Sequence, residues 1–455
     1  MIEMTAATPT HPLAIRDFRL YWIARFAAVF ATMAMVVVIG WQVYDLARSD
    51  YALTVRQSAL LLGMVGLAQF IPLLILTPVA GWVADRFERR GIAMCANAVD
   101  AGIALGLGWL TANDVLTLPI LFTFAALHGV ARAFVGPAMS AIAPNIVPPP
   151  LLPKAIAMSS IAWQGASVAG PAIGGLLYAR DAALPYWVAV GCLAIAIIAL
   201  LPVRRVVPPP LSGETRPVQQ MVEGLSYVRG HRFLLGAVTL DLFAVLLGGA
   251  TALLPVYARD ILHVGPEGLG QLRAAPAAGA AVVALWFAVR PLKHNVGAKM
   301  IAAVVAFGLA TVGFGLSGYV GNIQVSAPFG IGGKSDMLFA LLCLVLIGGF
   351  DMLSVYVRSS LVQLHTPDRM RGRVSAVSGL AISASNELGE VQSGIAAAAL
   401  GPVGAVVFGG VAAAAIAIAW ARLFPELRRA KNFDPPDITD TVAGTNKSPA
   451  KEFSR

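Results

Sequence analysis

The sequence predicts an all-α membrane protein, built as a twelve-helix bundle with two pseudo-symmetric halves. Hydrophobic residues make up 58% of its 455 residues and charged residues 13%, whereas a soluble domain has roughly 25% charged residues. Its mean hydropathy is +0.75, and its apolar runs are close to the roughly 20 residues that cross a hydrocarbon core. Lipid cannot satisfy exposed backbone groups and the sequence has no long β-alternation, so the spans must be helices.

Proline, glycine and charge clusters bound the apolar runs and place about twelve spans. In chain order we expect spans at 18–45, 57–84, 91–112, 117–143, 152–179, 183–202, 233–258, 267–290, 297–318, 337–364, 374–400 and 402–424. The predicted organisation is an N-terminal six-helix bundle (1–202), a cytoplasmic linker (203–232), a C-terminal six-helix bundle (233–424) and a disordered cytoplasmic tail (425–455).

The loop charges predict the orientation, because cytoplasmic loops collect Lys and Arg. One side of the predicted bundle carries most of them and both termini; its basic residues are Arg16, Arg86, Arg89, Arg90, Lys154, Arg204, Arg205, Arg216, Arg229, Arg232, Lys293, Lys299, Arg369, Arg371 and Arg373. The other side carries Arg48, Arg56, Arg180, Arg259 and Lys334. Both termini are therefore expected in the cytoplasm. The net charge of +9 fits this topology and does not indicate a nucleic-acid partner.

The long linker between the halves contains apolar residues at helical spacing, namely Val218, Met221, Val222 and Leu225. This spacing predicts a short helix on the membrane surface. A packed linker with no further role is the simpler alternative, because periodicity shows only that one face is covered.

Two segments that each join a fourth to a fifth span resemble one another. NIVPPPLLPKAIAMSS (145–160) aligns with QLHTPDRMRGRVSAVS (363–378), which pairs Pro149 with Pro367. Parallel six-helix repeats place a cavity between the halves near the middle of the membrane. The repeat therefore indicates a transporter.

Ionisable side chains inside the spans are costly, so each needs a partner, a cavity or a function. They are Arg25, Asp100, His128, Arg132, Asp241, Asp351, Arg358, Glu387 and Glu390. Spans 1, 4, 7 and 10 are expected to line the central path, and the predicted substrate-cavity residues are Arg25, His128 and Arg358. Simpler interpretations are a structural hydrogen bond for Asp100, polar packing for His128 and an acidic partner for Arg25.

Proton coupling requires a desolvated carboxylate that each side of the membrane reaches in turn. Asp351, near the midpoint of its span, is the leading candidate, with Arg132 in the symmetry-related span 4. Arg358 lies on the same face as Asp351 but roughly 10 Å away along the axis, so the two would bracket a ligand rather than touch. The remaining proton-coupling candidates are Glu387, Glu390 and Asp241.

The turn GWVADRFERR (81–90) interrupts two apolar runs with five charges in six positions. It resembles the signature between spans 2 and 3 of the major facilitator superfamily, Gly-x-x-Ala-Asp-Arg-x-Gly-Arg-Arg. The matching residues are Gly81, Ala84, Asp85, Arg86, Arg89 and Arg90, and Glu88 replaces the usual Gly. The resemblance implies a conformational latch in which Asp85 docks near the start of span 11. A carboxylate at a helix N-terminus is favourable by roughly 0.3 to 1 kcal/mol. The corresponding turn in the second half, 289–297, matches this signature poorly.

ASVAGPAIGG (166–175) resembles the span 5 signature found chiefly in antiporters of this family. Gly170, Pro171, Gly174 and Gly175 match it, and Ala166 replaces its first Gly. Small residues allow close helix contact and proline removes a backbone bond, so a hinge is expected here. Arg132 also resembles the span 4 arginine that the family associates with proton coupling. Segments 16–26 and 361–377 look most like the enterobactin-exporter and macrolide-efflux branch.

The resemblance implies a secondary active transporter of a bacterial-type inner membrane that exports an amphipathic small molecule, siderophore-like or drug-like, by proton antiport. The alternatives are a proton-coupled symporter for a nutrient or lysophospholipid, and a non-transporting sensor on the same fold. No enzyme is expected, because the sequence has no nucleophile elbow, no HExxH pair and no phosphate-binding glycine motif followed by Lys. The expected partners are the substrate, protons and the bilayer, for a monomer with no cofactor, metal or nucleic acid.

Overall fold

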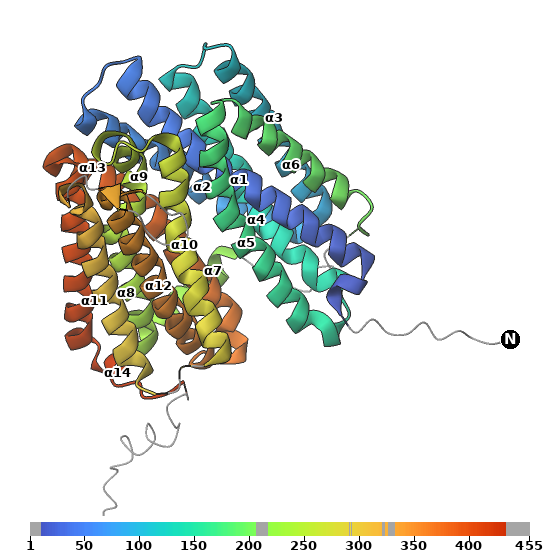
Figure 1. The fold of residues 1–455 in the computed structure, drawn as a ribbon. Helices are drawn as coiled ribbons and strands as arrows, with labels where there is room; N and C mark the ends of the chain where they lie inside the picture. Colours follow the sequence, from blue (N-terminus) through green and yellow to red (C-terminus); the bar gives the residue numbers. More distant parts are fainter. Residues whose placement is uncertain are drawn as a thin grey trace, which may run out of the picture.

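The computed structural model describes residues 11–205, 217–290, 292, 294–320, 324–325 and 333–433. Two helical bundles lie beside each other, the first coloured blue to green and the second yellow-green to red (Figure 1). The predicted all-α fold is confirmed. Within the described residues, the strands are confined to a two-residue antiparallel pair, β1 (Gln324–Val325) with β2 (Gly333–Lys334).

The first bundle consists of six helices, two of which follow a short 3₁₀ turn. In chain order they are η1 (Pro12–Ala14), α1 (Arg16–Ser49), α2 (Val55–Arg86), α3 (Arg89–Ala112), α4 (Leu118–Ile146), η2 (Pro149–Leu151), α5 (Leu152–Arg180) and α6 (Leu184–Leu200). Capping interactions and first-turn prolines define where several of these helices begin. Thr54 and Gln57 form a capping box at the start of α2, and Pro119 and Pro185 occupy the first turns of α4 and α6, where no hydrogen-bond donor is needed.

The second bundle follows α7 (Pro217–Gly230) and is less regular. Its elements are α8 (Arg232–Gly248), η3 (Ala250–Leu253), α9 (Leu254–Val256), the π-helical turn η4 (Tyr257–Ile261), α10 (Gly265–Val289), α11 (Val296–Gly315), η5 (Ser317–Tyr319), α12 (Ser335–Leu364), α13 (Asp368–Leu423) and α14 (Pro425–Arg428). The predicted seventh span, 233–258, is therefore a broken helix that changes course at Gly249.

Helix α13 contains two spans. Gly401 has a φ of 78°, and Pro402 follows it, so the chain bends sharply at this point. The bend separates the predicted spans at 374–400 and 402–424. By length and composition, nine helical segments of the described chain suffice to cross a membrane, with α13 counted once. The long helix α5 and the shorter apolar helix α6 complete the twelve-span fold.

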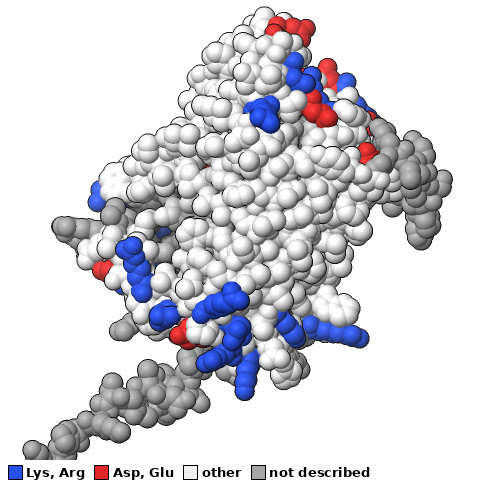
Figure 2. Space-filling model, turned by 90° about the vertical axis from the view of Figure 1, so that its left-hand side faces the viewer, with Lys and Arg blue, Asp and Glu red and all other residues white. Residues whose placement is uncertain are grey.

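The two ends of the molecule carry different charge. Figure 2 shows Lys and Arg gathered at one end, a broad belt without charge, and both signs of charge at the other end. Large apolar side chains within the spans, such as Ile75, Ile198 and Leu285, are exposed, as expected for a lipid-facing surface. We term the end that carries mainly Lys and Arg the basic end; α1 and α3 begin there. The other is the closed end, where α2 and α10 begin.

Two segments outside the spans also adopt structure. Helix α7 occupies the predicted linker, and Glu223 pairs with Arg373 of α13 at 2.7 Å. A Cβ on Gly224 would lie 2.8 Å from the Arg373 carbonyl, so α7 packs tightly on α13. The tail differs from the expectation over 425–433: α14 packs on α11, and the Gly297 amide donates to the Ala430 carbonyl at 3.0 Å. Residues 434–455 lie outside the described chain.

Close backbone contact between α10 and α12 leads to a stability prediction. A Cβ at Gly348 would lie 1.7 Å from the Pro276 carbonyl, whereas a Cβ at Gly191 of α6 would meet nothing within 4 Å. Both glycines are inside helices, so alanine gains a similar helix propensity at each. We expect Gly348→Ala to destabilise the fold by about 1 to 3 kcal/mol through overpacking, and Gly191→Ala to be neutral or stabilising. Thermal unfolding of the two variants in one detergent measures the difference, and equal melting temperatures would contradict this packing.

Candidate functional site

An ion pair joins the two bundles near the middle of the membrane. Arg132 of α4 and Glu387 of α13 lie 3.2 Å apart, with side chains 19% and 14% exposed. The same guanidinium donates to Gln69 Oε1 of α2 at 3.2 Å. Two of the predicted proton-coupling residues, 255 positions apart in sequence, are thus in direct contact.

Glu390 lies one helical turn from Glu387, where α13 meets α2. A Cβ at Gly66 of α2 would lie 2.6 Å from a Glu390 carboxylate oxygen, so the absence of a side chain at Gly66 makes room for this carboxylate. The positive charges of Arg132 and of Arg273, from α10, both act on Glu390, and the charge of Glu387 opposes them. Two arginines and two glutamates from both bundles therefore form one cluster, which we term the central cluster (Arg132, Arg273, Glu387 and Glu390).

The break in span 7 lies beside the central cluster. α8 ends at Gly248, and the freed carbonyl of Gly249 accepts a hydrogen bond from Ser393 of α13 at 3.0 Å. A Cβ on Gly249 would lie 3.2 Å from the Gly389 carbonyl. Unwound backbone inside a membrane is tolerated where protein or a cavity satisfies it. The break therefore brings irregular backbone to within one residue of Glu390.

The other predicted carboxylates of the second bundle are arranged differently from the central cluster. Asp241 of α8 forms a buried ion pair with Arg358 of α12, a contact that the sequence did not predict. Arg358 therefore has a carboxylate partner within its own bundle. Asp351 is half-buried on the same face of α12, and no hydrogen bond or ion pair to it occurs among the described residues.

A polar triad lies inside the first bundle. Asp100 of α3 accepts from Thr32 of α1 at 3.3 Å and is 2.6 Å from Nδ1 of His128 of α4. All three side chains are buried. The hydrogen bonds agree with the structural interpretation of Asp100 and place His128 inside the bundle, away from the interface between the two halves.

Arg25 has no carboxylate partner among the described residues. Its Nη1 donates to the hydroxyl of Tyr21 at 3.1 Å, and that hydroxyl lies 2.9 Å from Ser159 of α5. Both hydroxyl groups are buried, so they hold the guanidinium in one orientation. The simpler interpretation expected an acidic partner for Arg25. In the structure, a tyrosine hydroxyl takes that place.

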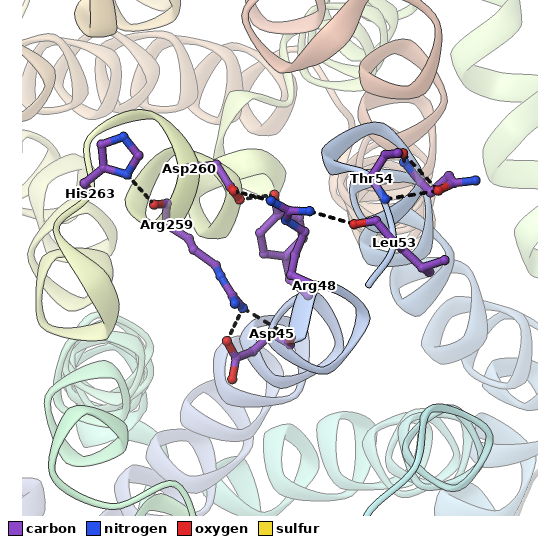
Figure 3. A network of polar contacts seen from close by, with 9 residues as sticks. Asp45, Arg48, Leu53, Thr54, Arg259, Asp260 and His263 are labelled. Atoms are coloured by element: carbon purple, nitrogen blue, oxygen red, sulfur yellow. Dashed lines mark hydrogen bonds and ion pairs between the residues drawn. The ribbon is translucent and has the colours of Figure 1, made fainter. Parts of the chain in front are cut away.

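Two reciprocal ion pairs join the bundles at the closed end (Figure 3). Asp45 near the end of α1 pairs with Arg259 of η4, and Arg48 pairs with Asp260 at 3.0 Å. Tyr44 also donates a hydrogen bond to Asp260. Arg48 additionally donates to the Leu53 carbonyl after α1. We term Asp45, Arg48, Arg259 and Asp260 the closed-end gate; the sequence marked its two arginines only as loop charges.

Glycine contacts bring the bundles together next to the gate. A Cβ at Gly175 of α5 would lie 2.8 Å from Gly270 of α10, and one at Gly63 of α2 would lie 2.9 Å from Gly394 of α13. All these positions lie in the closed half of their helices, and the bundles diverge toward the basic end (Figure 1). The two bundles are therefore in direct contact at the closed end in this conformation.

The predicted hinge residues of span 5 mediate helix packing. α5 continues through Pro171 without interruption. A Cβ at Gly170 would lie 2.6 Å from the Phe30 carbonyl of α1, and one at Gly174 would lie 3.2 Å from Ala34. Together with the Gly175 contact, these small residues fit α5 between α1 and α10.

The predicted latch lies at the basic end of α2 and α3. Arg86 lies over the Trp82 ring at 4.4 Å, Arg89 donates to the Ala84 and Ala141 carbonyls, and Arg90 pairs with Glu88 at 2.9 Å. These contacts remain within the first bundle. A Cβ at Gly81 would meet nothing within 4 Å. The side chain of Asp85 lies outside the described part of the structure, so its docking onto span 11 stays a prediction.

Similarity to known proteins agrees with this architecture. The enterobactin exporter EntS of Citrobacter koseri is 26% identical over 445 residues, which cover 95% of this chain and 96% of the relative. EntS of Escherichia coli O1:K1 is 26% identical over 436 residues, covering 94% and 96%. Both relatives align along almost the whole chain.

Solved transporters share the fold. A D-xylose-proton symporter superposes with a TM-score of 0.69 at 13% identity and covers 91% of this chain and 98% of its own. A bacterial homologue of the human lysosomal transporter Spinster superposes with a TM-score of 0.67 at 14% identity, covering 91% and 99%. The family model of the Major Facilitator Superfamily matches residues 21–390. The chain therefore belongs to the Major Facilitator Superfamily and is a multi-pass membrane transporter.

Proposed function

We propose that the protein exports an amphipathic small molecule, siderophore-like or drug-like, in exchange for protons, with its basic end in the cytoplasm. The observation that carries this proposal is the central cluster, in which carboxylates of one bundle meet an arginine of the other inside the membrane. A proton taken up there changes an interaction between the two moving parts of the transporter. Similarity to two enterobactin exporters supports the direction and the substrate class.

The charge balance of the central cluster supports coupling. With both glutamates ionised, Arg132 and Arg273 are balanced, and the attraction between Arg132 and Glu387 holds the bundles together across the middle of the membrane. Protonation of one glutamate leaves a net positive charge and weakens this attraction. The two protonation states therefore favour different arrangements of the bundles, as a proton-driven cycle requires.

The gate and the basic end define the conformation. Cytoplasmic loops collect Lys and Arg, and Figure 2 shows these residues at the basic end. With that end in the cytoplasm, the closed-end gate shuts the periplasmic side, and the structure is inward-facing. Substrate then enters from the cytoplasmic side, as an exporter requires.

Topology is the first test. We expect reporters fused after residue 433 and within 206–216 to report a cytoplasmic location, because α6 and α14, which precede these positions, end at the basic end, and reporters fused after Asn113 to report a periplasmic one. Alkaline phosphatase and fluorescent protein fusions measure the two sides. A periplasmic C-terminus would reverse the proposed direction of the cycle.

The central cluster predicts which carboxylate couples protons to transport. We expect Glu390→Gln to abolish substrate uptake driven by a proton gradient into everted vesicles while substrate binding is retained, because the amide cannot take up and release the proton. Asp351→Asn is the matched comparison on the neighbouring span, and it tests the candidate that the sequence favoured. Loss of coupling in Asp351→Asn with normal coupling in Glu390→Gln would move the proton site to α12.

Arg132 provides an independent test of the same cluster. Arg132→Ala should abolish coupling, because Glu387 then loses its partner in the other bundle, and Arg132→Lys should restore part of it through charge alone. The readout is the proton-to-substrate ratio in the same vesicles. Equal impairment of coupling and binding in both variants would show that Arg132 serves substrate binding instead.

The closed-end gate predicts a conformational shift. Arg259→Asp leaves Asp45 facing a like charge, so we expect the outward-facing population to rise roughly tenfold, about 1.4 kcal/mol. The double exchange Asp45→Arg with Arg259→Asp should reverse this shift by restoring an ion pair. Cysteine accessibility at the closed end measures both. If the double exchange behaves like Arg259→Asp alone, the pair does not hold this end shut.

A further inference from the structure

An apolar groove runs along the outside of the first bundle, in its basic half. α2 and α3 both pack on α4 and make little contact with each other, so a channel remains between them. Its volume is about 630 Å³, and its walls include Val83, Phe87, Cys95, Val99, Val130 and Phe134. Phe87, Cys95 and Val99 are exposed, and no described residue of the second bundle lines the groove. The groove therefore opens toward lipid and not toward the interface between the bundles.

The groove has the depth of one lipid leaflet. Helix α3 begins at the basic end with Arg89, and its part of the lining extends to Val99. At about 1.5 Å per residue, Val99 lies roughly 15 Å from the start of the helix. This is about half of the roughly 30 Å hydrocarbon core. An acyl chain from the leaflet at the basic end therefore reaches the full depth of the groove.

The walls of the groove suit a hydrocarbon chain. Glu88 is the charged residue of the described lining, and Arg90 pairs with it at 2.9 Å. Glu88 lies in the turn between α2 and α3, so this ion pair stands at the mouth. Below the mouth, the described lining consists of aliphatic and aromatic side chains, glycine and Cys95. A contiguous apolar surface of this kind marks contact with a membrane or another apolar partner.

A cation stands beside the mouth. Arg86 lies over the Trp82 ring at 4.4 Å, and this ring is 6.3 Å from the Phe87 ring that lines the groove. Arg86 is exposed, and no ion pair joins it to a carboxylate in the described part of the chain. Arg89 and Arg90, by contrast, both donate to backbone carbonyls of the first bundle. Arg86 is therefore the guanidinium of this turn that a lipid phosphate can reach.

We propose that the groove binds an anionic phospholipid of the leaflet at the basic end, with an acyl chain between α2 and α3 and the phosphate at Arg86. Trp82 and Phe87 then lie where the headgroup joins the chains, the level at which aromatic side chains gather in membrane proteins. Among the described side chains of the mouth, Arg90 balances Glu88, and Arg86 adds a positive charge. Basic sites at the cytoplasmic surface favour anionic headgroups. This site depends neither on the exported molecule nor on the direction of transport.

The test compares three lipids on the purified full-length protein in detergent. Dimyristoyl phosphatidylglycerol is the probe, dimyristoyl phosphatidylcholine has the same chains without net charge, and dihexanoyl phosphatidylglycerol has the same headgroup with chains too short to fill the groove. Native mass spectrometry measures how much of each lipid stays bound. We expect the probe to be retained roughly tenfold more strongly than either comparison lipid. Equal retention of both dimyristoyl lipids would overturn the headgroup contact, and equal retention of both phosphatidylglycerols would overturn the groove.

Variants then separate the two parts of the site. Arg86→Gln should weaken retention of the probe by about tenfold, because a charge-assisted contact is lost, and Arg86→Lys should weaken it less, because lysine also binds phosphate. Neither should change retention of dimyristoyl phosphatidylcholine. Cys95→Trp and Val99→Trp each place an indole in the groove, so both should reduce retention of both dimyristoyl lipids. Unchanged retention of the probe in Arg86→Gln or in both tryptophan variants would overturn the proposal.

Matched controls distinguish this site from the general surface. Arg229→Gln removes another exposed arginine, on α7, and Ile198→Trp places an indole on the exposed face of α6, outside the groove. Both should retain the probe like the wild type. Thermal unfolding in the same detergent shows that each variant is folded. If Arg229→Gln weakens retention as much as Arg86→Gln, the effect is one of overall charge and the proposal is overturned.

Two observations identify the occupant. A phosphatidylglycerol with a diazirine at the end of one chain, added to membranes that contain the protein, should crosslink to α3 near Val99 and to α4 near Val130. Crosslinks confined to other helices would overturn the proposal. Native mass spectra also report the oligomeric state. A dimer that Cys95→Trp converts to a monomer, with retention of the probe unchanged, would assign the groove to a second copy of the chain instead of a lipid.

Discussion

Lipid offers no partner to a charged side chain, and this constraint accounts for most of the polar structure of the protein. Each charged group inside the spans must find its partner on another helix or in a cavity. Asp100 contacts His128 within the first bundle, and Asp241 pairs with Arg358 within the second. Arg132 pairs with Glu387 across the interface between the bundles. Pairs within a bundle stabilise it as a rigid unit, whereas a pair across the interface depends on how the two units sit.

We propose that the same distinction separates structural from functional charge. A pair inside one bundle keeps its geometry when the bundles move as units, so it does not report the transport cycle. The central cluster and the closed-end gate change with every such movement, because their members lie on both sides of the interface. Arg25 is the remaining case, since its hydrogen-bond partner among the described residues is the neutral Tyr21 hydroxyl.

Span positions could be predicted from the sequence because hydropathy and run length are local properties of the chain. The bend at Gly401 and Pro402, for example, lies where the spans at 374–400 and 402–424 were expected to meet. The pairing of charges is not local. Arg358 was placed with Asp351 by helical spacing, yet it pairs with Asp241 on another helix. Asp45 and Arg259 lie 214 residues apart, and no periodicity connects them.

Two close backbone contacts join the bundles, one between Gly63 and Gly394 and one between Gly175 and Gly270. A rotation that preserves both contacts must turn about the line through them. At about 1.5 Å per residue, α2 extends roughly 12 Å from Gly63 to its closed-end start and roughly 35 Å to its basic end. The lever arms therefore differ about threefold, and a rotation of about ten degrees moves the basic end by about 6 Å but the closed end by about 2 Å. In such a rotation, a large movement at the basic end accompanies a small one at the closed end, so the two ends of the molecule would open by different amounts.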